Sequence, residues 1–189
     1  MSTKSKSIVK LKSSEKLSKF LIENRLHKKD FAQMVGVTLS YVYNLIDNAI
    51  PFSTRSTTLE RIAVVMDISP EEFIEYKIPQ EPVLVDETLE FIREKLKSKN
   101  MTTLQFLKSF PRKKRVEIVD ILRGARPIPL NWEEIENIAQ ILDISKEEIY
   151  VFWESRLKQV LSSAGFNFEN NKEFGNSILN CCRKFIEKS

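Results

Sequence analysis

The side chains that could carry out chemistry are few and scattered along this chain. His27 is the single histidine, and Cys181 and Cys182 are the two cysteines, adjacent in the sequence. The chain has no glycine-rich phosphate loop, no Gly-x-Ser-x-Gly sequence and no cysteine and histidine spacing suited to a metal. We therefore expect no enzyme activity, no catalytic residue, no metal site and no cofactor. We interpret the cysteines as packing residues of an amphipathic helix, with redox or metal sensing as the alternative.

Positive charge is concentrated at the start of the chain. The 189 residues carry a net charge of +4, and residues 1–53 hold 9 Lys and Arg against 4 Asp and Glu. This excess suits an anionic partner, and a solvated basic arm at residues 1–12 is the alternative. No apolar run approaches the length of a membrane span, and adjacent cysteines rarely form an unstrained disulfide. These features predict a cytoplasmic protein that does not enter a membrane.

The sequence contains an internal repeat. Residues 59–76 match residues 135–152 at an offset of 76, and residues 17–35 match residues 92–110 at an offset of 75. The second copy therefore has one inserted residue. A repeat of two such long units predicts tandem copies of one small domain.

Helical patterns occupy both copies and predict an all-α fold of two tandem five-helix domains with a helical tail. Apolar residues recur at helical spacing, and only 4 residues are glycine. Thr38 is a predicted cap of the third helix, and Thr57 with Glu60 of the fourth. Ser69, Pro70 and Glu72 predict the start of a fifth, and Ser145 with Glu148 repeats that signal. The predicted segments are an arm at 1–12, domains at 13–79 and 87–155, a linker at 80–86 and a tail at 156–189.

The second and third predicted helices of the first copy carry small and apolar residues at diagnostic spacing. Ala32 is small enough for two helices to cross closely, and Gly36 tolerates a turn with positive φ. Three apolar residues then anchor the third helix to a core: Val37, Val42 and Leu45. With the helices before and after it, this pattern resembles the Cro/XRE family of phage-repressor helix-turn-helix DNA-binding domains.

The resemblance implies that helix 39–47 enters the major groove of double-stranded DNA. It implies base contacts from four residues of that helix: Leu39, Ser40, Tyr43 and Asn44. Asn44 suits adenine, and Leu39 suits the methyl group of thymine. Phosphate contacts are expected from Lys28, Lys29, Thr38, Tyr41 and Arg55. Lys28 stands where the family often has glutamine. The alternative for Tyr41, Tyr43 and Asn44 is that they are ordinary surface or core residues that do not contact DNA.

The second copy departs from this pattern. Leu107 and Pro111 replace the small residue and the turn glycine, and proline cannot adopt a positive φ. Glu117 and Asp120 occupy the helix equivalent to 39–47, where acidic groups would repel phosphate. We interpret this copy as a degenerate domain used for self-association or for a secondary phosphate contact through a basic run: Arg112, Lys113, Lys114 and Arg115.

Together these features predict a sequence-specific, repressor-like transcription regulator that binds double-stranded DNA. The resemblance implies a homodimer, and a protein partner could bind the second domain or the tail. The alternative is a protein-interaction adaptor or antitoxin that uses the same fold to grip a partner protein.

Overall fold

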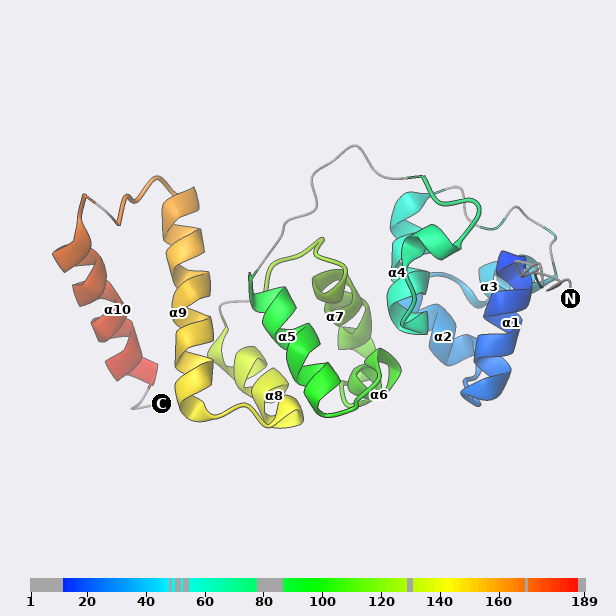
Figure 1. Ribbon diagram of the computed structural model, residues 1–189, viewed down its shortest axis with the longest axis horizontal. Coiled ribbons are helices and arrows are strands. Elements are labelled where there is room, and N and C mark those ends of the chain that lie inside the picture. The colour runs from blue at the N-terminus through cyan, green and yellow to red at the C-terminus, as the bar shows by residue number, and fades with distance from the viewer. Residues whose placement is uncertain are drawn as a thin grey trace, which may run out of the picture. The chain divides into compact units, whose positions relative to one another are not determined.

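The computed structural model describes residues 12–47, 49, 52, 55–77, 87–128, 131–168 and 170–186. These residues form ten α-helices, two short 3₁₀ helices and no strand, which confirms the predicted all-α fold (Figure 1). The predicted linker at 80–86, and all of the predicted arm except Lys12, lie outside the described residues. Among the described helices, none combines the length and the apolarity that crossing a bilayer requires.

The helices pack as two compact units that interleave in the sequence. Unit 1 contains Met1–Pro82 and Thr103–Arg123, and unit 2 contains Val83–Thr102 and Gly124–Ser189. This division differs from the boundary predicted at 80–86, because residues 103–123 make their contacts within unit 1. The limits of independently folding domains stay a prediction.

Unit 1 is built on the four helices that precede residue 67. Its helices are α1 (Ser13–Glu23), α2 (Lys28–Val35), α3 (Leu39–Ile46), α4 (Ser56–Met66), η1 (Pro70–Glu72), α6 (Thr103–Lys108), η2 (Arg112–Lys114) and α7 (Arg115–Leu122). Helix α2 lies at the centre and packs against α3, α4 and α7. Its apolar face is fully buried at Phe31 and Val35, as are Leu17 of α1 and Leu59 of α4. The periodic apolar residues of the sequence thus form one core.

Helix α7 is covered on nearly all sides. Ile118, Val119, Ile121 and Leu122 are at most 7% exposed, and Asp120 between them is 8% exposed. A helix that is apolar around most of its circumference has to be enclosed by its neighbours. Contacts with α2, α4 and α6 enclose α7 within unit 1.

Two predicted helix starts in the first copy are wrong. Where a fifth α-helix was predicted, residues Pro70–Glu72 form only one 3₁₀ turn. The Ser69 hydroxyl bonds to the Glu71 carboxylate, so it does not cap a longer helix. The chain leaves the turn because Phe73 enters the core, where it is 2% exposed and stacks on Phe52.

Helix α4 begins one residue earlier than its predicted cap. Arg55 is the N-cap residue and no side chain caps the helix, so Thr57 already lies inside it. Glu60, the predicted second half of that capping box, instead accepts a hydrogen bond from Arg123 at 2.7 Å. By contrast, the Thr38 cap of α3 is confirmed, because its hydroxyl oxygen accepts from the Tyr41 N–H at 3.2 Å.

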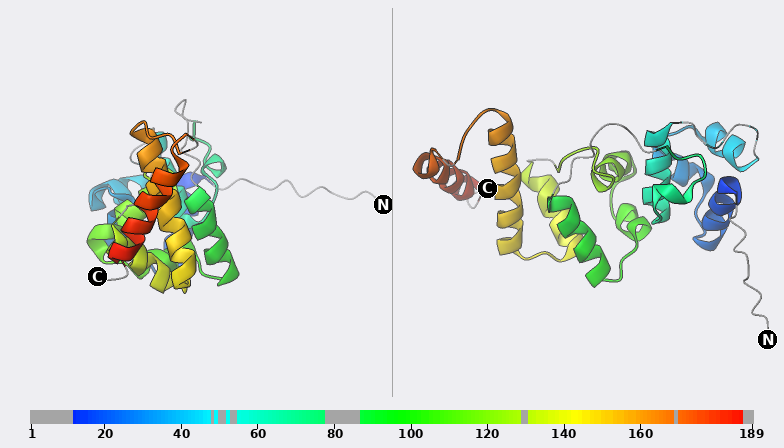
Figure 2. Two further views of the ribbon diagram at one scale, coloured as in Figure 1. Left: turned by 90° about the vertical axis from the view of Figure 1, so that its left-hand side faces the viewer. Right: turned by 45° about the horizontal axis from the view of Figure 1, so that its top comes forward.

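Unit 2 contains α5 (Glu87–Ser98), α8 (Trp132–Leu142), α9 (Lys146–Ser163) and α10 (Lys172–Ile186). The predicted capping box of Ser145 and Glu148 is present at the start of α9. Gly165, with a φ of 91°, follows the end of α9, and the chain then turns back into α10 (Figure 2). The predicted tail helix is therefore confirmed.

Candidate nucleic-acid interface

The turn between α2 and α3 has the geometry that its sequence predicts. Gly36 has a φ of 77°, and its N–H donates to the Ala32 carbonyl at 2.9 Å. Ala32 is 3% exposed where the two helices meet, and Val42 and Leu45 are buried beneath α3. A residue with a Cβ atom resists such a φ, so glycine sets the angle between the helices.

Helix α3 presents one polar and aromatic face to solvent. Leu39 is 39% exposed and Tyr43 is 43% exposed, while Ser40 and Asn44 are also exposed. These positions repeat one helical turn apart, so they share a face, and Val42 and Leu45 anchor the opposite face to the core. The structure therefore brings the four predicted base-reading residues together on an accessible surface.

Lys28, one of the predicted phosphate-binding residues, lies beside this face. Lys28 begins α2, and its Nζ atom stands 4.2 Å from the centroid of the Tyr43 ring. This cation–π contact joins the start of α2 to the exposed face of α3. Lys29 and Arg55 are exposed, Thr38 is exposed while it caps α3, and Tyr41 is half-buried.

A charged network that the sequence did not predict supports the turn from behind. Asp120 of α7 accepts from Arg61 of α4 through Nε and Nη2, both at 2.8 Å, and from Arg123 Nε at 2.7 Å. Arg123 also donates to Glu60 at 2.7 Å. Arg61 Nη1 lies 3.5 Å from the Val35 carbonyl oxygen at the end of α2. The network therefore ties α7 to α4 and to the residue before the turn glycine.

The pKa of Asp120 reflects this pairing. Burial alone would raise the pKa, but the hydrogen bonds and positive charges of Arg61 and Arg123 outweigh burial and hold it below the ordinary value. Asp120 is thus ionised at neutral pH, as a partner for two guanidinium groups. In the sequence, the apolar residues on both sides of Asp120 were the signal that this carboxylate would be buried.

The second copy does not reproduce the glycine turn. Leu107 is fully buried, and Pro111 has a φ of −54°, so this connection has no positive φ at that position. The 3₁₀ helix η2 fills the connection instead. Since α7 is enclosed, the helix equivalent to α3 offers no comparable exposed face.

The four residues of the basic run have different surroundings. Arg112 Nη2 lies 3.2 Å from Asp30 Oδ1 of α2, and Lys114 pairs with Glu117 at 3.4 Å. Arg115 donates to the carbonyl oxygens of Lys108, the last residue of α6, and of Phe110, which follows that helix. Lys113 is exposed.

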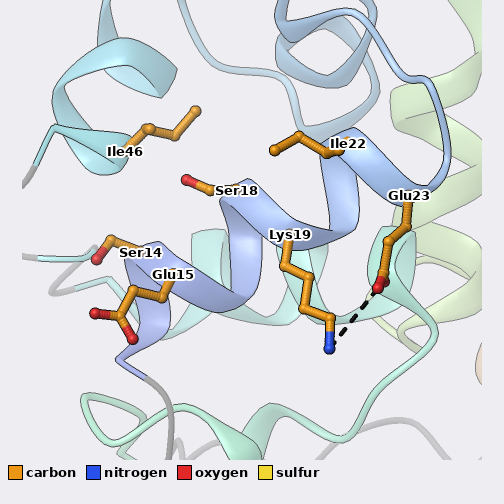
Figure 3. A pocket seen from close by; sticks show the side chains of 7 residues that line it. All are labelled: Ser14, Glu15, Ser18, Lys19, Ile22, Glu23 and Ile46. Atoms are coloured by element: carbon orange, nitrogen blue, oxygen red, sulfur yellow. Dashed lines mark ion pairs between the residues drawn. The ribbon is translucent and has the colours of Figure 1, made fainter.

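An open pocket of about 450 Å³ lies along α1 (Figure 3). Its lining residues are Ser14, Glu15, Ser18, Lys19, Ile22, Glu23 and Ile46. Lys19 pairs with Glu23 at 3.7 Å across one turn of α1. Both signs of charge line the pocket beside two isoleucines, so it is a poor site for a phosphate group.

A comparison with known protein families found a match in this part of the chain. Residues 16–79 match the Cro/C1-type HTH DNA-binding domain. The match contains the glycine turn, α2 to α4 and every predicted base-reading and phosphate-binding residue of the first copy. It supports one DNA-binding helix-turn-helix domain and, for the chain as a whole, the general role of a DNA-binding regulator.

The Cro/C1-type domain ends before α6 and α7, so the match covers neither the basic run nor the second copy. Searches of curated proteins and of solved structures found no match to this chain. The match therefore assigns no role to the residues outside 16–79.

Proposed function

We propose that this protein is a sequence-specific, repressor-like transcription regulator that reads the major groove of DNA with α3. The observation that carries the proposal is the exposed face of α3, held at a glycine turn inside the matched Cro/C1-type domain. The major groove admits an α-helix and presents a distinct pattern of donors and acceptors for each base pair. The protein would then act by occupying a promoter, without catalysis or a cofactor.

The chemistry of the exposed face suits base reading. The Asn44 amide can pair with adenine through two hydrogen bonds, Ser40 can donate or accept, and Leu39 can contact a thymine methyl group. Lys28 is suited to phosphate because it stands at a helix N-terminus, where backbone N–H groups also favour anions. Its contact with Tyr43 would fix the phosphate group and the base-reading face relative to each other.

Selection of bound duplexes from a random pool tests this function. The full chain should enrich one short DNA sequence. That sequence should contain two symmetric half-sites if the protein binds as a dimer. Binding that enriches no sequence would contradict base reading, and no binding even at low salt would contradict a DNA-binding role.

We also propose that residues 87–155 are a degenerate second copy of the same fold. Helix α8 lies at an offset of 76 residues from α4, and α7 lies at the same offset from α3. Arg25 and Asn100 both have positive φ, as do Asp67 and Asp143, at matching positions of the repeat. These shared helix ends support a common ancestral fold, and Pro111 explains why its turn has diverged.

In this proposal, two protein chains form a homodimer through unit 2. Val151 of α9 is 68% exposed and Phe174 of α10 is 63% exposed, so each offers apolar surface that a partner could cover. The same exposure favours the alternative of an adaptor or antitoxin that grips a protein. The molar mass in solution distinguishes them: a dimer mass for the pure chain supports pairing, and a monomer that binds no DNA supports the alternative.

A further inference from the structure

The connection between α6 and α7 exposes positive charge beside the start of α2. Lys108 and Lys113 are exposed, and the Arg112 side chain is 62% exposed. We propose that Arg112 and Lys113, called here the basic turn, bind backbone phosphates of DNA next to those held by α2, and so lengthen the contact beyond the base-reading site. This inference rests on the proposed function and adds a second phosphate site to it.

The basic turn is tied to the DNA-binding helices within unit 1. Helix η2 packs against α2, and Arg112 reaches Asp30 in the first turn of α2 at 3.2 Å. Successive residues of a helix lie about 100° apart around its axis, so exposed Lys29 stands between Lys28 and Asp30. Lys28, Lys29 and the basic turn therefore follow one another around the start of α2, and Asp30, the acidic residue of that turn, is paired with Arg112.

The pair formed by Arg112 and Asp30 favours this reading. Asp30 is the one acidic residue in the first turn of α2, where it would repel a phosphate, and Arg112 neutralises it. The guanidinium of Arg112 is planar and carries several N–H donors, so Arg112 can keep its pair with Asp30 and still donate to a phosphate group.

The two basic residues that follow the basic turn, Lys114 and Arg115, are bonded to other groups of unit 1. Arg115 is bound to the carbonyl oxygens at the end of α6, and Lys114 is paired with Glu117. Helix α7 itself is enclosed by α2 and α4, so the second copy cannot offer this helix to a groove. The second copy instead exposes the basic turn, which precedes α7, on the surface of unit 1.

Salt titrations on two duplexes test the proposal. Both contain the selected sequence, and one extends it on each side by about one helical turn. The log of the binding constant should fall more steeply with log salt on the longer duplex, since each neutralised phosphate contributes a slope of about 0.9. The double variant Arg112→Ala, Lys113→Ala should lower the slope on the longer duplex by about 1 to 2 and leave the sequence preference unchanged.

The control removes two lysines from unit 2, Lys97→Ala and Lys158→Ala, which are exposed on α5 and α9. The proposal expects this control to keep the slope of the unaltered chain. Three results would overturn it: an unchanged slope in the basic-turn variant, an equal loss in the control, or self-association lost in place of DNA binding. If the unaltered chain shows no sequence preference, the proposed function is wrong. If the unaltered chain shows the preference and only the slope of the basic-turn variant is unchanged, the second phosphate site alone is wrong.

Discussion

Replacing Asp120 with alanine tests whether α7 belongs to the DNA-binding unit. The substitution removes three charge-assisted hydrogen bonds, two from Arg61 and one from Arg123. Breaking a buried ion pair costs about 3–5 kcal/mol because it leaves an unpaired charge. Here the cost should be lower, about 2–3 kcal/mol, because the arginine side chains are 26% and 14% exposed and Arg123 keeps Glu60.

The two tryptophans make this destabilisation measurable for each unit. Trp132 and Trp153 lie on α8 and α9 of unit 2, so tryptophan fluorescence follows unit 2 alone. Far-ultraviolet circular dichroism follows the helices of both units. In urea, Asp120→Ala should move the dichroism transition of unit 1 to lower denaturant and leave the tryptophan transition in place.

Glu117→Ala on the same helix is the matched control. Its partly exposed pair with Lys114 should contribute less than about 1 kcal/mol. The reasoning is refuted if Asp120→Ala costs no more than this control, or if its effect is confined to the tryptophan transition.

Three further predictions concern the same unit. Gly36→Ala should destabilise unit 1 by about 1–2 kcal/mol, because φ is 77° and a Cβ would meet Val116 Cγ1 at 3.2 Å; equal thermal stability of the two chains would contradict this. Lys28→Ala should weaken binding to all DNA and lower the salt slope by about 1. Because the side chains of Lys28 and Tyr43 touch, the double variant Lys28→Ala, Tyr43→Ala should lose less binding free energy than the two single variants lose together; losses that simply add would argue against coupling. Because the pKa of native Asp120 is depressed, its stabilisation is complete above about pH 3.9 and is lost as pH falls through the lower native pKa; an acid titration of Asp120→Ala should lack this loss.

Local patterns in the sequence predicted the turn between α2 and α3 and the residues on the exposed face of α3, because both depend on neighbouring residues alone. The glycine turn needs only Gly36 and its neighbours, and the exposed face of α3 follows from helical spacing around Val42 and Leu45. The capping boxes gave a mixed outcome. Ser145 caps α9 as predicted, but the first-copy signal at Ser69 is overridden by the burial of Phe73.

Long-range packing was beyond these patterns. Asp120 was interpreted as an acidic group opposed to phosphate, whereas it is buried and paired with arginines from α4 and from the end of α7. Nothing in the spacing of residues 103–123 shows that these helices pack against α2 and α4. Their contacts depend on the shape and charge of residues far apart in the sequence, as the pair of Arg61 with Asp120, 59 residues apart, illustrates.

The central claim is that α3 reads base edges, and the affinity ratio between specific and random duplexes tests it most directly. Asn44→Ala should weaken binding to the selected sequence by about 1–3 kcal/mol and leave binding to random DNA nearly unchanged. Asn137→Ala, at an exposed position of α8, is the control and should change neither affinity. If Asn44→Ala weakens binding to both duplexes equally, or to neither, α3 does not read bases in the manner proposed.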